Sequence, residues 1–211
     1  DEEVSQGNKK NEYVKGLAEE VSGMSNEIMG YIQGLVVKLE EIAEKHTDEN
    51  GVTEMKALNE TEKNYQLWMG AGGEYKNSGR GEGEAMKLKD ALDKYVKQCN
   101  DFIGKWGKDS TGKVAIKFDP IVVNPSEDEA IPKGSEHKNQ TWEYFTFHSK
   151  PVIADIAMME KYKLDVQEKQ SELLNFLKSK LGAVTFKIDS LIAIDAPTSR
   201  VVAAGMKFET K

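Results

Sequence analysis

Residues 142–181 read WEYFTFHSKPVIADIAMMEKYKLDVQEKQSELLNFLKSKL, and the rest of the chain is arranged around them. Pro151 precedes a run that contains neither Gly nor Pro until Gly182. Pro is accepted in the first turn of a helix, and Gly readily takes the left-handed conformation that ends one. Apolar residues recur along the run at steps of three, four or seven, at Val152, Ile156, Met159, Val166, Leu173, Leu177 and Leu181. This spacing predicts a long helix whose apolar side needs neighbours elsewhere in the chain.

Two upstream stretches supply such neighbours. From Tyr13 to about His46 the apolar residues are Val14, Leu17, Val21, Met24, Ile28, Ile32, Leu35, Leu39 and Ile42. From Ala85 to Trp106 they are Leu88, Leu92, Tyr95, Cys99 and Phe102. Both series step by threes and fours, which predicts two more long helices and so a mainly α, up-down helical bundle. Cys99 lies within the second apolar stripe, where a cysteine is a small core residue and not a nucleophile.

Four glycines interrupt the first predicted helix, at Gly16, Gly23, Gly30 and Gly34. Each lowers helix stability by roughly 1 kcal/mol relative to Ala. Two interpretations account for them: close packing against another backbone, or simple tolerance in a helix that is stabilised by tertiary contacts. We favour tolerance.

The connections are predicted from turn-forming residues. Gly7 and Asn8 indicate a turn within residues 1–9, and residues 47–51 indicate another. Residues 52–69 form an irregular connection with a short helix that ends at Trp68. Residues 70–83 form a glycine-rich loop, residues 114–118 a short strand, and residues 124–141 an exposed loop.

Two glycine-containing stretches resemble phosphate-binding loops without meeting their requirements. Residues 107–113 have the glycine and lysine spacing of a P-loop, but Val114 stands where a magnesium-binding Ser or Thr is needed. This stretch and the loop at residues 70–83 both follow a predicted helix, whereas phosphate loops follow a strand. We interpret both as polar turns.

Beyond Leu181 the apolar period changes to two. Val184, Phe186 and Ile188 begin a series of short strands that continues to Phe208. So few strand residues do not make a stable sheet alone. They either pair with another chain or begin a β-domain whose remainder is missing, and we favour the second interpretation. The expected domains are a helical bundle at 1–182 and the truncated start of a β-sandwich at 183–211.

Composition and histidine placement argue against several functions. The net charge of −7 argues against nucleic-acid binding, which needs Lys and Arg to neutralise phosphates. His46, His137 and His148 are far apart and form no metal-ligand spacing. We therefore predict no catalytic, cofactor-binding or metal-binding residues. The chain begins at Asp1 with neither Met nor a signal peptide, and no apolar run could span a bilayer, so we expect a fragment or a processed product.

Several stretches, in order and spacing, resemble the GldM/PorM family. They are Trp142-Glu143-Tyr144-Phe145 with Phe147-His148, Pro151-Val152 and Ala154; Ser171-Glu172-Leu173-Leu174-Asn175-Phe176-Leu177; Leu17 through Ser25 with Tyr31-Ile32; and Met86-Lys87-Leu88-Lys89 with Asp93-Lys94-Tyr95. The similarity covers most of residues 10–195 and is weakest in the loops.

The resemblance implies a non-enzymatic role in the type IX secretion and gliding machinery of Bacteroidetes. Members are anchored in the inner membrane, span the periplasm, form homodimers and continue into immunoglobulin-like β-domains. Their partners are the proton-driven membrane protein GldL and the outer-membrane ring proteins GldK and GldN. This chain lacks the segments that the family uses for those contacts, namely the transmembrane helix, most of the first periplasmic helix and the later β-domains. The implied role here is a rigid bundle with a hinge near residues 181–185 that passes motion outward.

Two other function classes stay open from the sequence. A periplasmic ligand-sensing helical bundle would share the long amphipathic helices, and a pocket lined by Trp68, Trp106 and Trp142 would favour it. An enzyme would need a deep cleft with convergent polar groups.

Overall fold

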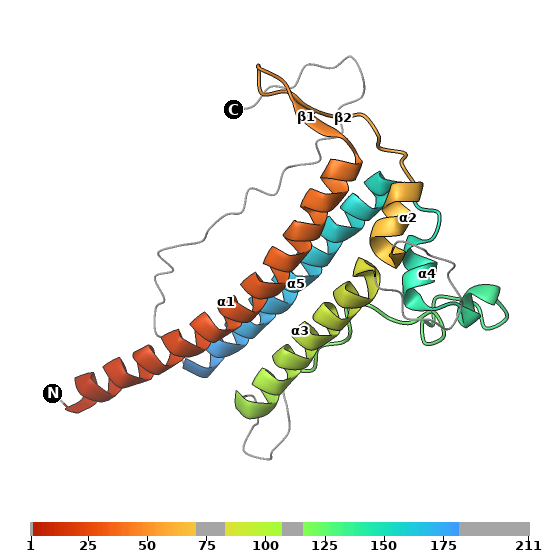
Figure 1. The fold of residues 1–211 in the computed structure, drawn as a ribbon. Coiled ribbons are helices and arrows are strands. Elements are labelled where there is room, and N and C mark those ends of the chain that lie inside the picture. The colour runs from red at the N-terminus through yellow and green to blue at the C-terminus, as the bar shows by residue number, and fades with distance from the viewer. Residues whose placement is uncertain (1, 71–82, 107–115, 182–211) are drawn as a thin grey trace. The chain divides into compact units, whose positions relative to one another are not determined.

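The computed structural model describes residues 2–70, 83–106 and 116–181 (Figure 1). Their fold is mainly α, as the sequence predicts. In chain order the elements are α1 (Glu2–Ile42), β1 (Lys45–Thr47), β2 (Thr53–Met55), α2 (Glu62–Met69), α3 (Glu84–Trp106), the 3-10 helix η1 (Glu136–Asn139), α4 (Trp142–Phe147) and α5 (Val152–Leu181). The three long helices predicted from apolar spacing are α1, α3 and α5.

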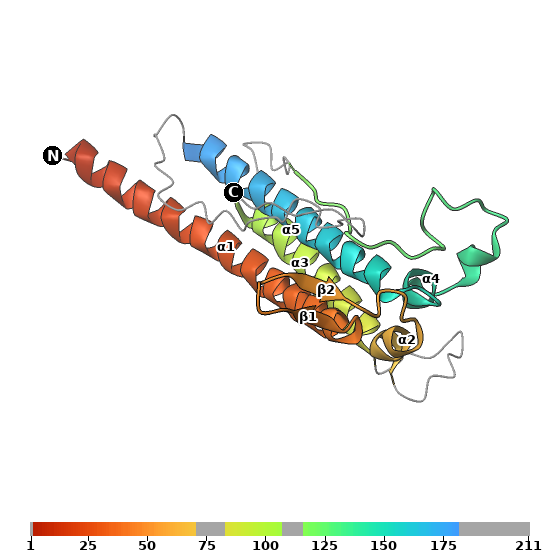
Figure 2. The same cartoon turned by 90° about the horizontal axis from the view of Figure 1, so that it is seen from above.

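The long helices lie side by side and share one core (Figures 1 and 2). α1 runs antiparallel to both α3 and α5. The core consists of the predicted apolar seams, and its most completely buried members include Val21, Ile32, Leu39, Leu88, Leu92, Met159, Val166 and Leu173. Burying one such side chain contributes roughly 1.5–3 kcal/mol, so the seams hold the bundle together.

α1 begins earlier than the sequence predicts, at Glu2, and no turn interrupts it at Gly7 and Asn8. Once a helix is nucleated, each further residue adds one backbone hydrogen bond, so single residues of low propensity do not stop it. The helix ends at Ile42, and Glu44 then takes the left-handed conformation with φ 54°. The N-terminal part of α1 extends past the ends of α3 and α5 (Figure 1).

The four glycines of α1 lie on its exposed side. A Cβ atom added at Gly16, Gly23, Gly30 or Gly34 would meet no atom within 4 Å. Within the described residues, therefore, no backbone packs closely on these glycines.

A β-hairpin that the sequence analysis did not predict joins α1 to α2. β1 pairs with β2 antiparallel, with Lys45 opposite Met55 and Thr47 opposite Thr53. The predicted turn at residues 47–51 forms its tip, where the Asp48 carboxylate accepts hydrogen bonds from the backbone N–H groups of Asn50 and Val52. The short helix expected before Trp68 is α2.

The strand predicted at residues 114–118 is wrong over its described part, residues 116–118. Within the described residues, no strand pairs with Phe118. Instead the Asn100 side chain on α3 accepts from the Phe118 N–H at 2.8 Å and donates to its C=O at 2.9 Å. A side-chain amide thus satisfies the backbone groups that a second strand would otherwise pair.

Several predicted features lie outside the described residues. They are most of the glycine-rich loop at 70–83, the turn at 107–113 and the β-domain at 183–211. The exposed loop predicted at residues 124–141 lies within them and includes η1. Inside this loop, Lys138 Nζ donates to the carbonyl oxygens of Ser126 and Asp128.

Candidate functional site

A buried hydrogen-bond network joins the three long helices at mid-length. Tyr95 on α3 donates from its hydroxyl to the Val166 carbonyl oxygen on α5, at 3.1 Å. Ser25 on α1 lies 3.0 Å from the same hydroxyl and 3.0 Å from the Val21 carbonyl oxygen of its own helix. We call Ser25, Tyr95 and the Val166 carbonyl the mid-bundle network. It ties all three helices at a single level.

The mid-bundle network fixes the positions of the three helices along their axes. Ser25 is fully buried and Tyr95 nearly so. A shift of α3 along α1 and α5 would leave the Tyr95 hydroxyl without its partners, which costs about 1–3 kcal/mol for a buried polar group. Burial raises the pKa of Tyr95 well above its ordinary value, so the phenol keeps the proton that it donates.

A second buried polar cluster holds α2 against the first turn of α5. Asp155 is fully buried, and its Oδ2 accepts from Asn64 Nδ2 at 2.8 Å and from Trp68 Nε1 at 2.7 Å. Asn64 also donates to the Lys150 carbonyl at 2.9 Å, and its Oδ1 lies 3.1 Å from Trp68 Nε1. We call Asp155, Asn64 and Trp68 the Asp155 cluster.

The two carboxyl oxygens of Asp155 differ in their surroundings. Oδ2 accepts two hydrogen bonds, whereas Oδ1 has no partner among the described residues. Burial raises the pKa of Asp155 to about 6, against the opposing effects of the hydrogen bonds from Asn64 and Trp68 and of the Lys150 charge. A carboxyl group in this position can exchange a proton near neutral pH.

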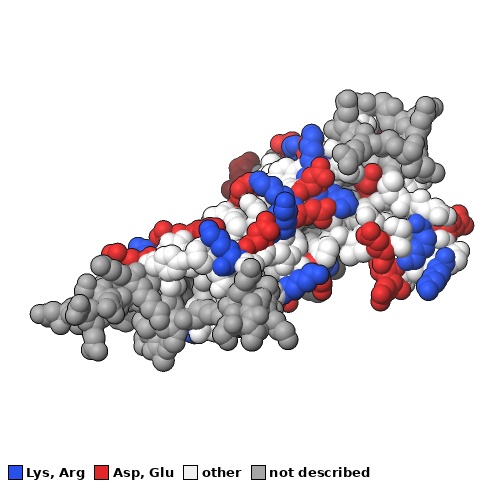
Figure 3. Space-filling view, turned by 90° about the horizontal axis from the view of Figure 1, so that it is seen from below, with Lys and Arg blue, Asp and Glu red and all other residues white. Residues whose placement is uncertain are grey.

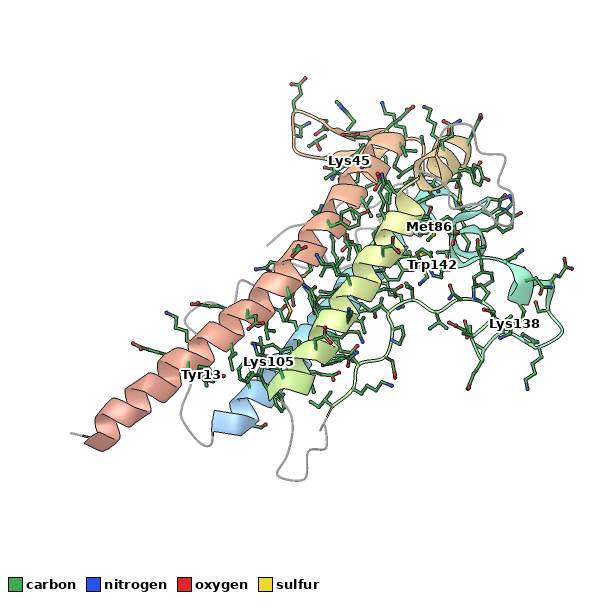
Figure 4. The ribbon with its side chains drawn as sticks, turned by 60° about the horizontal axis from the view of Figure 1, so that its bottom comes forward. Tyr13, Lys45, Met86, Lys105, Lys138 and Trp142 are labelled. Atoms are coloured by element: carbon green, nitrogen blue, oxygen red, sulfur yellow. The ribbon has the colours of Figure 1, made fainter. Side chains whose placement is uncertain are left out.

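Aromatic packing surrounds the Asp155 cluster but does not gather the three tryptophans. Trp68 stacks on Phe147 with ring centroids 4.0 Å apart, and Trp142 meets Phe147 edge-on at 5.4 Å. Trp106 instead contacts Tyr13 at 5.7 Å. Trp106 ends α3, and Figure 4 shows its neighbour Lys105 beside Tyr13, at the opposite end of the helix from Met86. The tryptophan-lined pocket that would favour a ligand sensor is therefore not formed by these side chains.

The other chemically interesting residues of the sequence are separate from these clusters. Cys99 is buried in α3, as predicted, and burial raises the pKa of its thiol. His46 lies on β1, His137 on η1 and His148 after α4. In the described part of the chain, no three His, Cys, Asp or Glu side chains are grouped so that they could hold a metal ion.

Acidic and basic side chains alternate on the face drawn in Figure 3. Among the described residues, charged side chains pair across or along the helices, as Lys94 does with Glu27 at 3.0 Å and Lys161 with Asp165 at 2.6 Å. Exposed pairs of this kind contribute only about 0–1 kcal/mol each. They keep the surface hydrated without marking a site.

Sequence reasoning missed both polar clusters, although their positions carry a signal. Ser25 stands between Val21 and Ile28 in the apolar seam of α1, and Asp155 stands between Val152 and Met159 in that of α5. A polar residue inside an apolar stripe indicates a buried group that needs a partner. The partner itself lies on another helix, so the stripe alone does not reveal it.

Comparison with known proteins identifies one family. The model of the GldM N-terminal domain matches residues 1–180 of the chain. The search of curated proteins found no match to the chain. Among the described residues, none of the helices combines the length and the apolar character that crossing a membrane requires.

Proposed function

The chain belongs to the GldM family, through an N-terminal domain that spans residues 1–180, and we propose that it is a non-enzymatic scaffold that transmits force. Membership places it in the type IX secretion and gliding machinery, whose periplasmic part this family forms. The proposed role is to link a proton-driven motor in the inner membrane to the ring in the outer membrane.

The mid-bundle network is the observation that supports this role most. A part that transmits force must move as one body, and its helices must not slide. Ser25 and Tyr95 fix three helices at one level, and apolar seams continue above and below them. α1 alone has 41 residues and is about 60 Å long at 1.5 Å per residue, a length suited to carrying motion over distance.

The proposed partners follow from the family. They are a second copy of the chain, a GldL-like membrane protein, and GldK-like and GldN-like ring proteins. The full-length protein would be anchored in the inner membrane, and its contacts with the membrane and ring proteins would lie mostly outside residues 1–211.

Affinity purification of the full-length protein from cells that carry the machinery tests the partners. After mild cross-linking we expect the membrane protein and the ring proteins to be recovered together. Recovery of neither would contradict the scaffold role.

Light scattering of residues 1–211 over a concentration series tests self-association. We expect a mass that reaches twice that of the chain. A constant monomer mass would show that this part of the protein does not form the homodimer.

A further inference from the structure

The Asp155 cluster provides a conformational device that the mechanical role does not require. We propose that Asp155 is a proton-operated latch, which holds α2 against the start of α5 when it is protonated and loosens that contact when it is ionised. The inference stands independently of the proposed function, because it concerns only how this end of the bundle responds to protons.

The latch joins two elements that have few other ties. α2 has eight residues, too few to persist as a helix by itself in water. Two of them, Asn64 and Trp68, face Asp155. The segment before α2 caps the N-terminus of α5, because the Leu58 and Glu60 carbonyls accept hydrogen bonds from the N–H groups of the first two α5 residues. Movement of α2 would therefore also affect how α5 begins.

Burial favours the neutral acid of Asp155, whereas the two hydrogen bonds that Oδ2 accepts favour the carboxylate and only partly offset the effect of burial. As the carbonyl oxygen of the neutral acid, Oδ2 can still accept from both Asn64 and Trp68. A proton on Oδ1 removes the buried charge, and the O–H that results meets no acceptor among the described residues. In the ionised form, Oδ1 carries charge in a fully buried position with no donor among the described residues. A buried charge without a full set of partners destabilises the closed arrangement, whereas the same charge in water does not.

The groups facing Asp155 do not replace the missing donor. α2 presents the neutral Asn64 amide and the Trp68 indole. Lys150, on the connection before α5, favours the carboxylate from a distance, and Tyr162 on α5 interacts with it electrostatically. α4 packs on Trp68 through the apolar Phe147. The remaining titratable side chains near this end include Tyr65 on α2, Glu60 before it, Glu143 on α4 and His148 after α4.

The size of the effect follows from the pKa of Asp155, which rises from 3.8 to about 6 in the closed form. In the open form, α2 has moved away from the start of α5. If the pKa of Asp155 returns to its ordinary value there, the equilibrium constant for opening increases about tenfold between about pH 5 and about pH 7.5. That change is large enough to measure by hydrogen exchange.

The test uses residues 1–211 and two readouts. The first is the NMR signal of the Trp68 indole N–H, followed from about pH 5 to about pH 7.5, a range that brackets the titration. The second is hydrogen exchange of the α2 amides, corrected for intrinsic rates and compared with α3. Asp155→Asn removes the titrating group. Asp165→Asn is the matched control, because Asp165 lies on the same helix in an ion pair with Lys161.

We expect the Trp68 signal to shift with a midpoint near 6 and α2 protection to fall about tenfold as the pH rises. Both effects should persist in Asp165→Asn and be absent from Asp155→Asn. A Trp68 signal that stays constant, or that titrates equally in Asp155→Asn, would overturn the proposal. So would a titration near 6 that leaves α2 protection unchanged. If Asp155→Asn does not fold, the two readouts on the unmodified chain still decide.

Discussion

Gly83 offers a sharp test of how α2 and α3 meet. It directly precedes α3 and is buried against the end of α2. A Cβ atom added to it would lie 2.0 Å from the Trp68 carbonyl oxygen and 2.6 Å from the Gly70 backbone nitrogen. These neighbours are backbone atoms, so no side-chain rotation can relieve the clash. Gly83→Ala must push the two helices apart.

The expected destabilisation is large for a single methyl group. Carbon and oxygen atoms in contact lie about 3.5 Å apart, so the backbone has to move by more than about 1 Å. Overpacking of this kind typically costs about 1–3 kcal/mol, and the rigidity of the neighbours favours the upper end. With a urea m-value of about 2 kcal/mol/M, a loss of about 3 kcal/mol lowers the unfolding midpoint by about 1.5 M.

The matched control is Gly104→Ala, within α3. A Cβ atom there would meet nothing within 4 Å. This variant should gain about 0.5–1 kcal/mol, because Ala favours the helix more than Gly does. Urea unfolding, followed by the far-ultraviolet circular dichroism signal of the helices, measures both effects. Equal effects of the two substitutions, or a neutral Gly83→Ala, would refute the described α2–α3 contact.

Three further changes give independent tests. Tyr95→Phe should lower the unfolding free energy by about 1 kcal/mol, since it removes the hydrogen bond to the Val166 carbonyl, and an unchanged urea midpoint would contradict that role. Because the pKa of Asp155 is raised from 3.8 in the unfolded chain to about 6 in the folded one, its protonation stabilises the fold. This contribution to the unfolding free energy is fully present below pH 3.8 and is lost as the pH rises through about 6. The unfolding free energy of the unmodified chain should therefore fall by about 3 kcal/mol relative to Asp155→Asn from a pH well below 3.8 to a pH well above 6, and parallel pH curves would argue against a buried carboxyl. Glu44→Gly should raise the thermal midpoint, with a gain of up to about 1 kcal/mol, because φ at this position is 54°, and a lower midpoint would count against that conformation.

The long helices were predictable because their signal is local. α3 has apolar residues at every third or fourth position, and its observed bounds differ by one residue from the predicted start at Ala85. α5 is bounded by Pro151 and Gly182, as the sequence indicates. Residue spacing and end signals within one segment were sufficient in both cases.

The features that the sequence did not reveal depend on contacts between distant segments. Residues 116–118 have the alternation of a strand, yet Asn100 takes the place of a partner strand. The Asp155 cluster pairs residues 87 and 91 positions apart in the chain. The hairpin at β1 and β2 has short, exposed strands without an apolar pattern, so periodicity could not indicate it.

The early start of α1 has a different cause. Gly7 and Asn8 have low helix propensity, which indicates a turn when they are considered alone. In the folded chain they extend a helix that is already held by its seam from Val14 onward. Cooperative propagation therefore outweighs the local preference.

The most direct test of the scaffold role is the secretion rate of cells whose full-length protein carries Gln33→Pro. Gln33 is exposed on α1, and Pro there kinks or breaks the helix at a cost of about 3 kcal/mol or more without replacing a core residue. Gln33→Ala is the control, since both variants lose the hydrogen bond from Lys163. Secretion is measured per assembled copy, so that reduced abundance is not mistaken for failed transmission. We expect Gln33→Pro complexes to assemble but to secrete poorly, while Gln33→Ala complexes secrete normally. Normal secretion by assembled Gln33→Pro complexes would contradict the scaffold role.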